Sequence, residues 1–451
     1  MLGVMSTTAD SDAETPAAAT RPGRHRIVLL PGDGIGPEIV DACRPVLATA
    51  FPTWDFTDAP IGWECWRTGG DPVPPQTWRA LESSDAALMA AITSKPAREA
   101  EAELAADLRG TGLTYRSPVL QLRQRLDLFA NVRPVEDVLH DGPARAPHGA
   151  ASASPSTASG PSSDPSSGPR FGFTVVRENT EGLYSHDVSM RGATGRDATG
   201  RNIVGRDTAA ADPAMAGIWE AVAHDPTVVR STPEDTAVAL RVTTGFAWRR
   251  LLRTAATLTG RAADPSLRRV TVADKPNILR ESGAIIRDAV EEVAAEFPDV
   301  DFDIANADAV AMRMITQPRS FDVIAAENLL GDMLSDLGAG LMGGLGLPSS
   351  GNIGADRAVF EPVHGSAPDI AGRGVANPAA FLLSAAMCAV HLAHRSDDRN
   401  HSDDAANDLR HRATRLRAAV IATLKTNPTP DLGGTNTTSG FAGDVVARLT
   451  S

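Results

Sequence analysis

Short apolar runs typical of β-strands alternate with helical patterns along the middle of this chain. The strand-like runs cover 26–30, 85–92, 171–176, 270–273 and 321–325. Helical patterns lie between them, for example over 119–127 and 285–297. Strands that alternate with helices are typical of an α/β protein with a mostly parallel sheet, because each helix returns the chain to the start of the next strand. This alternation is the strongest constraint on the fold.

The first strand-like run leads into a glycine-rich turn with the sequence PGDGIGPE over 31–38, and Pro37 suits the first turn of a helix. The glycines at 32, 34 and 36 give G-x-G-x-G, so the third is misplaced for the dinucleotide fingerprint G-x-G-x-x-G. No Gly-Lys-Ser or Gly-Lys-Thr follows, which argues against a P-loop. We therefore expect an α/β fold that is not a Rossmann fold.

Length and composition allow two or three domains with a buried core. The chain has 451 residues, 42% of them hydrophobic, and a net charge of -13. This charge argues against a nucleic-acid partner, so an anionic ligand would be met by local arginines. Three cysteines, far apart and odd in number, favour a reducing, cytoplasmic compartment over a disulfide framework or a zinc site. No run of 18 apolar residues occurs, so we expect no membrane span.

Three segments are expected to lie outside the packed core. Residues 1–25 are interpreted as a disordered leader, and the Ser, Pro, Gly and Ala-rich residues 141–169 as a flexible insertion. The stretch of about 190–230 carries arginines at a period of five, which fits neither helix nor strand. It is expected to be a mobile solvated loop or a cationic lid over an anionic ligand. Its arginines are Arg191, Arg196, Arg201 and Arg206.

Two carboxylates, Asp332 and Asp336, stand one helical turn apart in the segment 327–340. Apolar residues recur on another face of the same pattern, at Leu329, Met333, Leu337 and Leu341. Like charges at this spacing repel by about 0.2–0.5 kcal/mol on an exposed helix, and more where water is excluded. A divalent cation would relieve the repulsion, and oxygen-only ligands favour Mg²⁺ or Mn²⁺ over zinc. A solvated acidic helix face is the alternative.

Five further residues are candidates for binding or catalysis. Arg123, Arg133 and Arg177 would together hold a di- or tricarboxylate, because guanidinium groups pair bidentately with carboxylates. Tyr184, one of only two tyrosines, follows a polar run. Lys275 follows a strand-like run and so lies at the carboxyl end of a strand, where open α/β sheets place their ligands. Taken singly, each is also compatible with an ordinary structural or surface role.

Asp308 stands inside the otherwise apolar stretch 306–312. A buried carboxylate must be paired or bound to a metal, because an isolated charge is costly to bury. We therefore expect Asp308 to be a buried third oxygen ligand.

Six motifs follow one another between residues 26 and 392: LPGDGIGPE, DLFANVRP, RENTEGLY, DKPN, NLLGDMLSD and EPVHGSAPDIAG. In this order and at these spacings, the chain resembles the β-decarboxylating dehydrogenases, the family of isopropylmalate, isocitrate, homoisocitrate and tartrate dehydrogenases. The resemblance implies an isopropylmalate dehydrogenase-like fold of two α/β domains around a cleft. One domain would combine 26–128 with 343–451 on the cofactor side. The other, 129–342, would supply substrate, metal and dimer contacts.

The resemblance also implies the chemistry, a dehydrogenation with loss of CO₂ from a 3-substituted malate. Arg123, Arg133 and Arg177 would bind the malate carboxylates. Lys275 would assist removal of the hydroxyl proton while hydride passes to NAD, and Tyr184 would protonate the enolate that remains after CO₂ leaves.

By the same resemblance, Asp308, Asp332 and Asp336 would hold Mg²⁺ or Mn²⁺. Lys275 and Asp308 would come from the partner subunit, so the implied assembly is a homodimer with shared active sites. Some family members are regulatory subunits that have lost catalytic groups, but Tyr184 and all of these residues are present here.

The loop from 361 to 377 would surround the adenosine of the cofactor. The resemblance assigns its contacts to His364, Gly365, Ser366, Ala367, Asp369, Ile370 and Asn377. An acid at 369 accepts hydrogen bonds from both ribose hydroxyls and repels a 2′-phosphate, and NADP users of the family carry Lys and Tyr at 369 and 370. NAD is therefore the expected cofactor.

Substrate choice would depend on the residues just before Arg123. Val119 and Leu120 offer apolar contact, as in isopropylmalate enzymes, whereas Arg116 and Ser117 could meet a distal carboxylate. This favours 3-isopropylmalate or the substrate of a close paralogue. Homoisocitrate, isocitrate and tartrate or D-malate stay open as alternatives.

Overall fold

The computed structural model describes residues 24–139, 171–189, 194–196, 202–204, 221–222, 224–226, 228–231, 236–261, 266–398 and 403–451. The strands are β1 (His25–Gly32), β2 (Trp54–Asp58), β3 (Ala86–Ala91), β4 (Ala130–Glu136), β5 (Gly172–Glu178), β6 (Gly182–Ser189), β7 (Thr194–Arg196), β8 (Asn202–Val204), β9 (Ala237–Val242), β10 (Arg269–Asp274), β11 (Asp301–Asn306), β12 (Val323–Ala326), β13 (Ser349–Ile353) and β14 (Ala358–Pro362).

The helices are α1 (Gly36–Ala50), α2 (Trp63–Gly69), α3 (Pro75–Glu82), α4 (Ala97–Ala102), α5 (Pro118–Arg125), α7 (Gly245–Thr257), α8 (Arg280–Glu296), α9 (Ala307–Thr316), α10 (Asn328–Met342), α11 (Ala379–Asp398), α12 (Asp403–Thr426) and α13 (Thr438–Thr450). Short 3-10 turns cover Val228–Arg230, Pro318–Ser320 and Pro430–Leu432.

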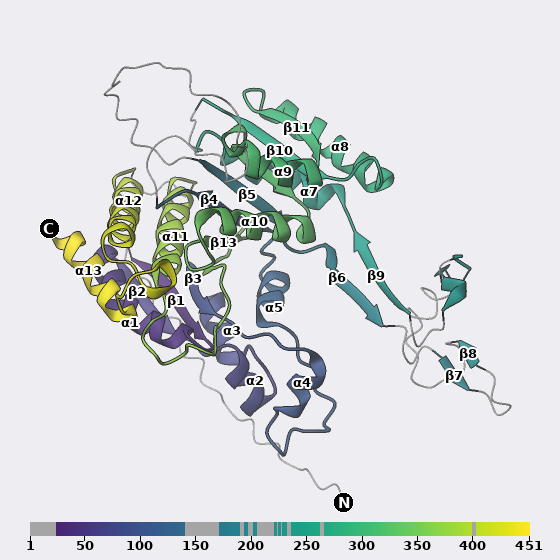
Figure 1. Cartoon of the computed structure of the whole chain (residues 1–451), viewed down its shortest axis with the longest axis horizontal. Coiled ribbons are helices and arrows are strands. Elements are labelled where there is room, and N and C mark those ends of the chain that lie inside the picture. The colour runs from purple at the N-terminus through teal and green to yellow at the C-terminus, as the bar shows by residue number, and fades with distance from the viewer. Residues whose placement is uncertain are drawn as a thin grey trace, which may run out of the picture.

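One large sheet runs through the body of the molecule, in the order β11-β10-β12-β5-β4-β13-β14-β3-β1-β2 (Figure 1). Most neighbours pair in parallel, and the antiparallel pairs are β5 with β4, β4 with β13, and β13 with β14. This confirms the predicted α/β fold with a mostly parallel sheet. The order also differs from the 3-2-1-4-5-6 order of a Rossmann sheet.

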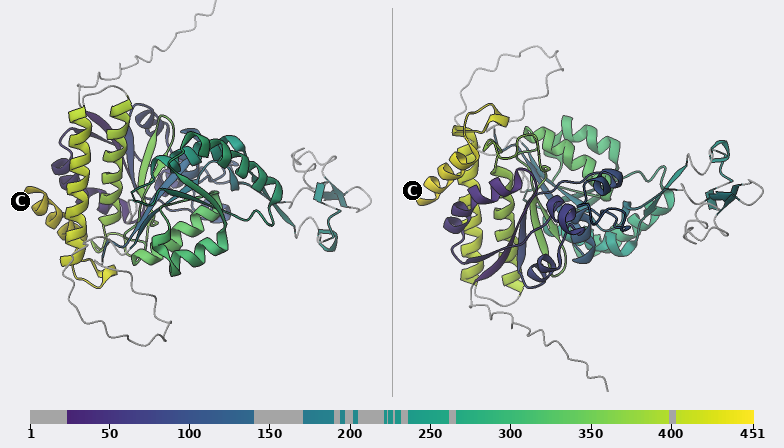
Figure 2. Two further views of the ribbon diagram at one scale, coloured as in Figure 1. Left: turned by 90° about the horizontal axis from the view of Figure 1, so that it is seen from above. Right: turned by 90° about the horizontal axis from the view of Figure 1, so that it is seen from below.

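Alternation along the strands explains why both faces of the sheet are covered. In β12, Val323 and Ala325 pack with α7 and α8, whereas Ile324 and Ala326 belong to the core cluster on the opposite face. In β1, Val28 and Leu30 point away from that cluster. Successive side chains of a strand point to opposite faces, so a strand that is apolar throughout needs helices on both sides. Figure 2 shows these helical layers on either side of the sheet.

The predicted strands and helices are present with small shifts at their ends. The helix predicted over 285–297 begins five residues earlier, at Arg280, and ends at Glu296. His25, which we assigned to the leader, already belongs to β1. The rest of the leader before Arg24, and the insertion at 141–169, lie outside the described residues. The division into two domains stays a prediction.

Helix α10 forms where predicted, but it packs through a different face from the leucine stripe. Met333 of that stripe is 63% exposed, whereas Gly331 and Gly338 are buried. A Cβ at Gly331 would lie 2.7 Å from Cβ of Arg177, and one at Gly338 would lie 2.6 Å from a methyl group of Val135. The helix therefore approaches β4 and β5 through glycines, which leaves the leucine stripe partly exposed.

Strands β6 and β9 form a separate antiparallel pair, called the arm here, which leads away from the body toward β7 and β8 (Figure 1). In the stretch predicted as a loop, β7 and β8 pair with each other, and Arg196 ends β7 opposite Asn202. The expectation of a segment without strands was wrong for these residues. Arg191, Arg201 and Arg206 lie outside the described residues. The lid hypothesis stays a prediction.

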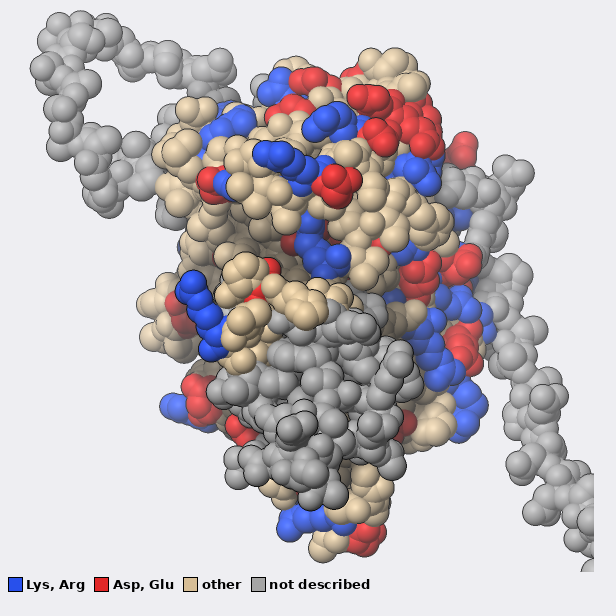
Figure 3. Space-filling view, turned by 90° about the vertical axis from the view of Figure 1, so that its right-hand side faces the viewer, with Lys and Arg blue, Asp and Glu red and all other residues tan. Residues whose placement is uncertain are grey.

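The length of apolar helices and the distribution of surface charge are relevant to binding partners. In the part of the chain that the structure describes, no helix is long and apolar enough to cross a membrane. On the face that carries the arm, Lys and Arg side chains are interspersed with Asp and Glu side chains (Figure 3).

Candidate active site

Three buried arginines converge where β4, β5 and α5 meet. Arg133 lies on β4, Arg177 on the neighbouring strand β5, and Arg123 in the last turn of α5. The register places Asn131 of β4 opposite Arg177. All three arginines predicted to bind carboxylates are buried. The structure thus brings together residues that lie up to 54 positions apart in the sequence.

Asparagines that the sequence analysis missed hold these arginines in place. The Asn352 Oδ1 atom accepts hydrogen bonds from Arg123 Nε at 3.1 Å, Asn131 Nδ2 at 2.9 Å and Asn179 Nδ2 at 2.8 Å. Asn328 Oδ1 accepts from Arg177 Nη2 at 2.7 Å. Asn131 stands two residues before Arg133 on one strand face, which was the only signal in the sequence. The guanidinium groups are therefore fixed before any ligand arrives.

Positive charge is concentrated in this cluster and is only partly offset by carboxylates of the chain, among them Asp332 and Glu361, the latter 3.8 Å from Arg123. Burial, together with the charges of Arg123 and Arg133, lowers the pKa of Arg177 to about 9. Burial is also the main cause of the lowered pKa of Arg123. Buried like charges repel and lack water, so a carboxylate ligand that pairs with them would be strongly favoured.

The acid pair of α10 faces the arginines. Asp332 forms ion pairs with Arg177 and with Arg133, the latter at 3.4 Å, and Asp336 lies 3.2 Å from Arg133 Nη1. Burial, and then the charge of Asp332, raises the pKa of Asp336. The pair lies beside the buried cations, one helical turn apart as predicted, with Asp332 mostly covered and the Asp336 side chain 58% exposed.

Tyr184 of β6 lies at the edge of this cluster. Its hydroxyl donates to Asp332 Oδ2 at 3.2 Å, and its ring centre lies 5.6 Å from the Arg177 guanidinium carbon. The side chain is partly exposed, which excludes the alternative of a buried core aromatic. Burial and the charge of Asp332 raise its pKa, so the hydroxyl keeps its proton at neutral pH.

Lys275 and Asp308 form a second group. Lys275 follows the carboxyl end of β10 as predicted, and its Nζ donates to Asp308 Oδ1 at 2.7 Å. The expectation that Asp308 is buried was wrong, because its side chain is 70% exposed in the first turn of α9. The hydrogen bond from Lys275 lowers the pKa of Asp308. Ala307 and Val310 on either side of Asp308 are buried, while the carboxylate faces outward.

The three candidate metal ligands do not form one cluster within a single chain. Among the described residues, no group of three or more His, Cys, Asp or Glu side chains has the geometry to hold a metal ion. Asp332 and Asp336 provide two hard oxygen donors, a type that suits Mg²⁺ or Mn²⁺. The outward-facing Asp308 lies apart from this pair in the chain.

In the segment before Arg123, some side chains pack against the core and others face the solvent. Val119 packs against the core cluster around β1 and β3, whereas Leu120 is partly buried and joins no core cluster. Ser117 Oγ accepts from Ser94 Oγ at 3.3 Å, and Arg116 Nη2 donates to Gln124 Oε1 at 2.8 Å. Leu120 is thus the apolar side chain that is available beside Arg123.

The predicted cofactor loop packs onto the glycine-rich turn. Ser366 O accepts from Ile35 N at 2.9 Å, and a Cβ at Gly34 would lie only 2.0 Å from that oxygen. His364 is largely buried, which lowers its pKa, and its Nε2 has no hydrogen-bond partner among the described residues. An orphaned polar atom beside Gly365 and Ala367 fits a loop built to receive a polar ligand.

The remaining predicted cofactor residues differ in accessibility. Asp369 is exposed, whereas Ile370 packs against the main core. The amide of buried Asn377 is engaged at both ends, since Nδ2 donates to Asp431 at 3.0 Å and Oδ1 accepts from Ala379 N at 3.0 Å. Asn377 thus supports the loop from within the chain.

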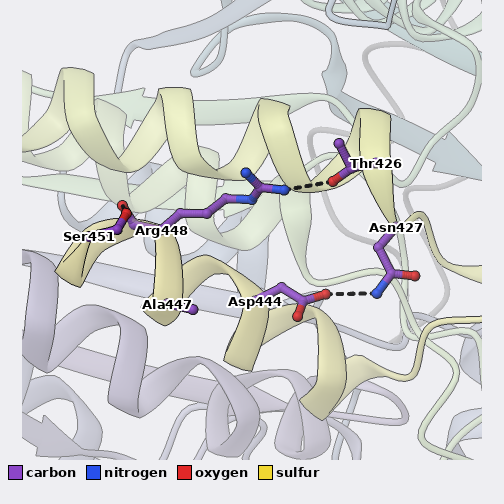
Figure 4. Close-up of a pocket in the computed structure, with 6 residues that line it drawn as sticks. All are labelled: Thr426, Asn427, Asp444, Ala447, Arg448 and Ser451. Carbon is purple, nitrogen blue, oxygen red and sulfur yellow. Dashed lines mark hydrogen bonds between the residues drawn. The ribbon is translucent and has the colours of Figure 1, made fainter.

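A polar surface hollow between α12 and α13 contains none of the predicted site residues. Its lining side chains bond to one another, with Arg448 donating to Thr426 at 2.7 Å and Asn427 to Asp444 at 2.8 Å (Figure 4).

A family model described as isocitrate/isopropylmalate dehydrogenase matches residues 26–445. The chain belongs to this family. It is 37% identical over 429 residues to the isocitrate/homoisocitrate dehydrogenase of Thermus thermophilus, covering 95% of this chain and 99% of that protein. It is also 37% identical over 429 residues to Protein DlpA of Legionella pneumophila, where the match covers 94% of this chain but spans only 59% of DlpA.

A solved isocitrate dehydrogenase from Methylococcus capsulatus has a similar fold, with a TM-score of 0.67 and 30% identity over 95% of this chain and 100% of that chain. Members of the isocitrate/isopropylmalate dehydrogenase family are decarboxylating dehydrogenases, so this protein is an oxidoreductase. The family generally uses a nicotinamide dinucleotide with Mg²⁺ or Mn²⁺, and its members are typically homodimers.

Proposed function

We propose that the protein oxidises and decarboxylates a 3-substituted malate with a small apolar substituent, 3-isopropylmalate or a close analogue, using NAD. The observation that carries this proposal is the buried arginine cluster next to the acid pair of α10. Three guanidinium groups provide counter-charge for two carboxylates, and the acid pair provides donors for a divalent cation beside them.

Different residues of the chain have different roles in this reaction. Arg123, Arg133 and Arg177 bind and orient the two malate carboxylates, since all three are held by asparagines before the substrate arrives. Lys275 takes up the proton of the C2 hydroxyl, and Tyr184 returns a proton to the carbon that loses CO₂. When bound, Mg²⁺ or Mn²⁺ would supply positive charge for the C2 oxygen, and NAD would accept the hydride.

We propose that the active unit is a homodimer, because the site of one chain is incomplete. Lys275 and Asp308 form an outward-facing group of their own. Near them, the surface of α9, α10 and the turn before α8 carries large exposed apolar side chains, among them Ile278, Met312 and Met333. Exposed apolar residues of this size mark interaction surfaces. A second copy on this surface would bring its Lys275 and Asp308 to the acid pair.

NAD is proposed over NADP because of Asp369. Its carboxylate is exposed on the loop that packs against the glycine-rich turn, where it would accept hydrogen bonds from ribose hydroxyls. A 2′-phosphate at the same place would meet a like charge.

A tricarboxylate such as isocitrate or homoisocitrate is the second candidate substrate. It is favoured by the Thermus relative, whose name records both activities. It is disfavoured by the engagement of Arg116 with Gln124 and of Ser117 with Ser94, which leaves Leu120 as the neighbour of the substituent.

Comparing NADH formation on 3-isopropylmalate, homoisocitrate, isocitrate, D-malate and tartrate tests the substrate. We expect the highest kcat/KM with 3-isopropylmalate. In a Leu120→Arg variant, we expect the preference to move toward homoisocitrate by about tenfold or more, because a guanidinium pairs with the added carboxylate. A Gln121→Arg variant controls for the added charge. A wild type that prefers a tricarboxylate would overturn the apolar assignment and leave the reaction class intact.

A further inference from the structure

Buried charged side chains gather where the arm joins the sheet, and the proposed mechanism does not use them. The parallel register of β10 and β12 pairs Ala273 with Ala326, so the next residues, Asp274 and Glu327, lie side by side. Both are buried. Arg241 of β9 reaches between them, 3.5 Å from Asp274 and 3.9 Å from Glu327. A guanidinium from the arm thus separates two carboxylates that would otherwise repel each other.

The cluster of Arg241, Asp274 and Glu327 is held by ion pairs more than by hydrogen bonds. Both oxygens of Asp274, Oε2 of Glu327, and Nε and Nη2 of Arg241 have no hydrogen-bond partner in the described part of the chain. Arg241 Nη1 donates to Ser282 Oγ of α8 at 2.8 Å, and its side chain is only 17% exposed. Buried polar atoms are rarely left without partners, so a cluster of this kind calls for an explanation in terms of function.

Arg241 stands opposite a bulge that contains Tyr184. In the arm, Gly182 pairs with Val242 and His186 pairs with Leu240, with a register shift between the two pairs. Three residues of β6, Tyr184 among them, therefore oppose Arg241 alone. Bulges are common beside active sites, where they redirect a side chain.

The start of the bulge touches the same cluster. Gly182 has φ +88°, and a Cβ there would lie 2.7 Å from Glu327 Oε2. The Tyr184 side chain itself is 42% exposed, so packing around its ring does little to fix it. Apart from the contacts of its hydroxyl with Asp332 and of its ring with Arg177, its position depends on the backbone of β6, which meets the cluster at Gly182 and lies opposite Arg241.

We propose that Arg241 is a positioning residue that places Tyr184 for catalysis by anchoring the bulge of the arm to Asp274 and Glu327. The inference rests on the proposed function, because it takes Tyr184 as the group that returns the proton after CO₂ has left. Asp274 directly precedes Lys275, and Glu327 caps α10, the helix of the acid pair. The contacts of Arg241 therefore connect the arm to the ends of β10 and β12, which lead to Lys275 and to the acid pair of α10.

The test compares Arg241→Met with Arg241→Lys in the full-length protein by stopped-flow measurement of NADH. Hydride transfer comes before protonation, so Arg241→Met should keep a rapid burst of NADH and an unchanged kcat/KM for the substrate, with KM falling in step with kcat. Its steady-state kcat should fall by about 100-fold, the usual cost of a misplacement of about 1 Å. Arg241→Lys, which keeps the charge, should recover most of kcat. An unchanged kcat in Arg241→Met would overturn the proposal.

The double variant Arg241→Met with Tyr184→Phe separates positioning from general damage. If Arg241 acts through Tyr184, the double variant turns over no more slowly than Tyr184→Phe alone. Losses that multiply would overturn the inference while leaving the proposed function in place. Wild-type protein that forms no NADH from any 3-substituted malate would overturn both. If Arg241→Met does not fold, Arg241→Met with Glu327→Gln, which removes one buried negative charge, allows the same comparison.

Discussion

At the scale of single residues, the candidate site is defined by which charges are paired within the chain and which are left for a ligand. Asp332 is in contact with two buried arginines, and Lys275 is in contact with Asp308. By contrast, the Asp369 carboxylate is exposed on the cofactor loop. A ligand gains the most binding free energy from a residue that has no partner in its own chain, because the ligand then forms a contact without displacing another.

Asp369 gives a direct test of cofactor choice. Replacing Asp369 by Lys and Ile370 by Tyr removes a negative charge that would repel the 2′-phosphate of NADP and adds a positive charge that would attract it. We expect the ratio of kcat/KM for NADP to that for NAD to rise by about 100-fold or more, since a charge-assisted contact is gained where a repulsion was lost. Asp356→Lys, on another exposed loop, controls for the change in net charge. An unchanged ratio would contradict the assignment of this loop to the cofactor.

At the scale of secondary-structure elements, α10 and the strands next to it set the geometry. The acid pair faces the arginines because Gly331 and Gly338 bring the helix close to β4 and β5. If the helix stood farther from the sheet, the contacts of Asp332 with Arg133 and Arg177 would lengthen. The close approach of backbone to side chain is therefore part of the active site.

A Gly331→Ala variant tests this close packing. The added methyl group would meet the side chain of Arg177, so we expect the free energy of unfolding to fall by about 1–3 kcal/mol, together with a loss of activity. Gly340→Ala is the matched control on the same helix. No atom lies within 4 Å of its Cβ position, and Ala there should add about 0.5–1 kcal/mol. Denaturant unfolding followed by circular dichroism measures both, and equal effects would contradict the packing argument.

The sequence predicted five strands of the large sheet and the helices α5, α8 and α10 because their apolar periods are local. It did not predict which face of α10 packs against the sheet. The leucine stripe indicated one face, but the helix contacts β4 and β5 through Gly331 and Gly338 on another face. It also misjudged Asp308, whose apolar neighbours concealed that the carboxylate faces outward. Asn352 was missed altogether, because its contact with Arg123 spans 229 residues and no local pattern records it. Which side chains meet across the fold is not encoded in local periodicity.

At the scale of the whole molecule, we propose that each chain presents two incomplete halves of a shared site. The arginines and the acid pair face one way, and Lys275 with Asp308 forms another outward-facing group next to exposed apolar residues such as Met312 and Met333. A homodimer in which each copy completes the other accounts for both features. The arm, which leads away from the body in Figure 1, is held at its base by Arg241.

Mixing two inactive variants tests for shared sites. Lys275→Met and Asp332→Asn should each be inactive alone. After unfolding and refolding together, about a quarter of wild-type activity should return, because half of the dimers are mixed and one of their two sites is intact. Lys275→Met mixed with Asp308→Asn is the control and should recover nothing, since both changes fall on the same half. No recovery in the first mixture would show that each site uses a single chain.

We propose that the arginine cluster and the acid pair carry out a metal-dependent oxidation coupled to loss of CO₂. The most direct measurement determines NADH and CO₂ together, during turnover of 3-isopropylmalate and homoisocitrate, with Mg²⁺ and after its removal by EDTA. We predict equal amounts of NADH and CO₂ from at least one substrate, loss of both products with EDTA, and recovery when Mg²⁺ is returned. NADH without CO₂, or turnover that is indifferent to EDTA, would contradict the account.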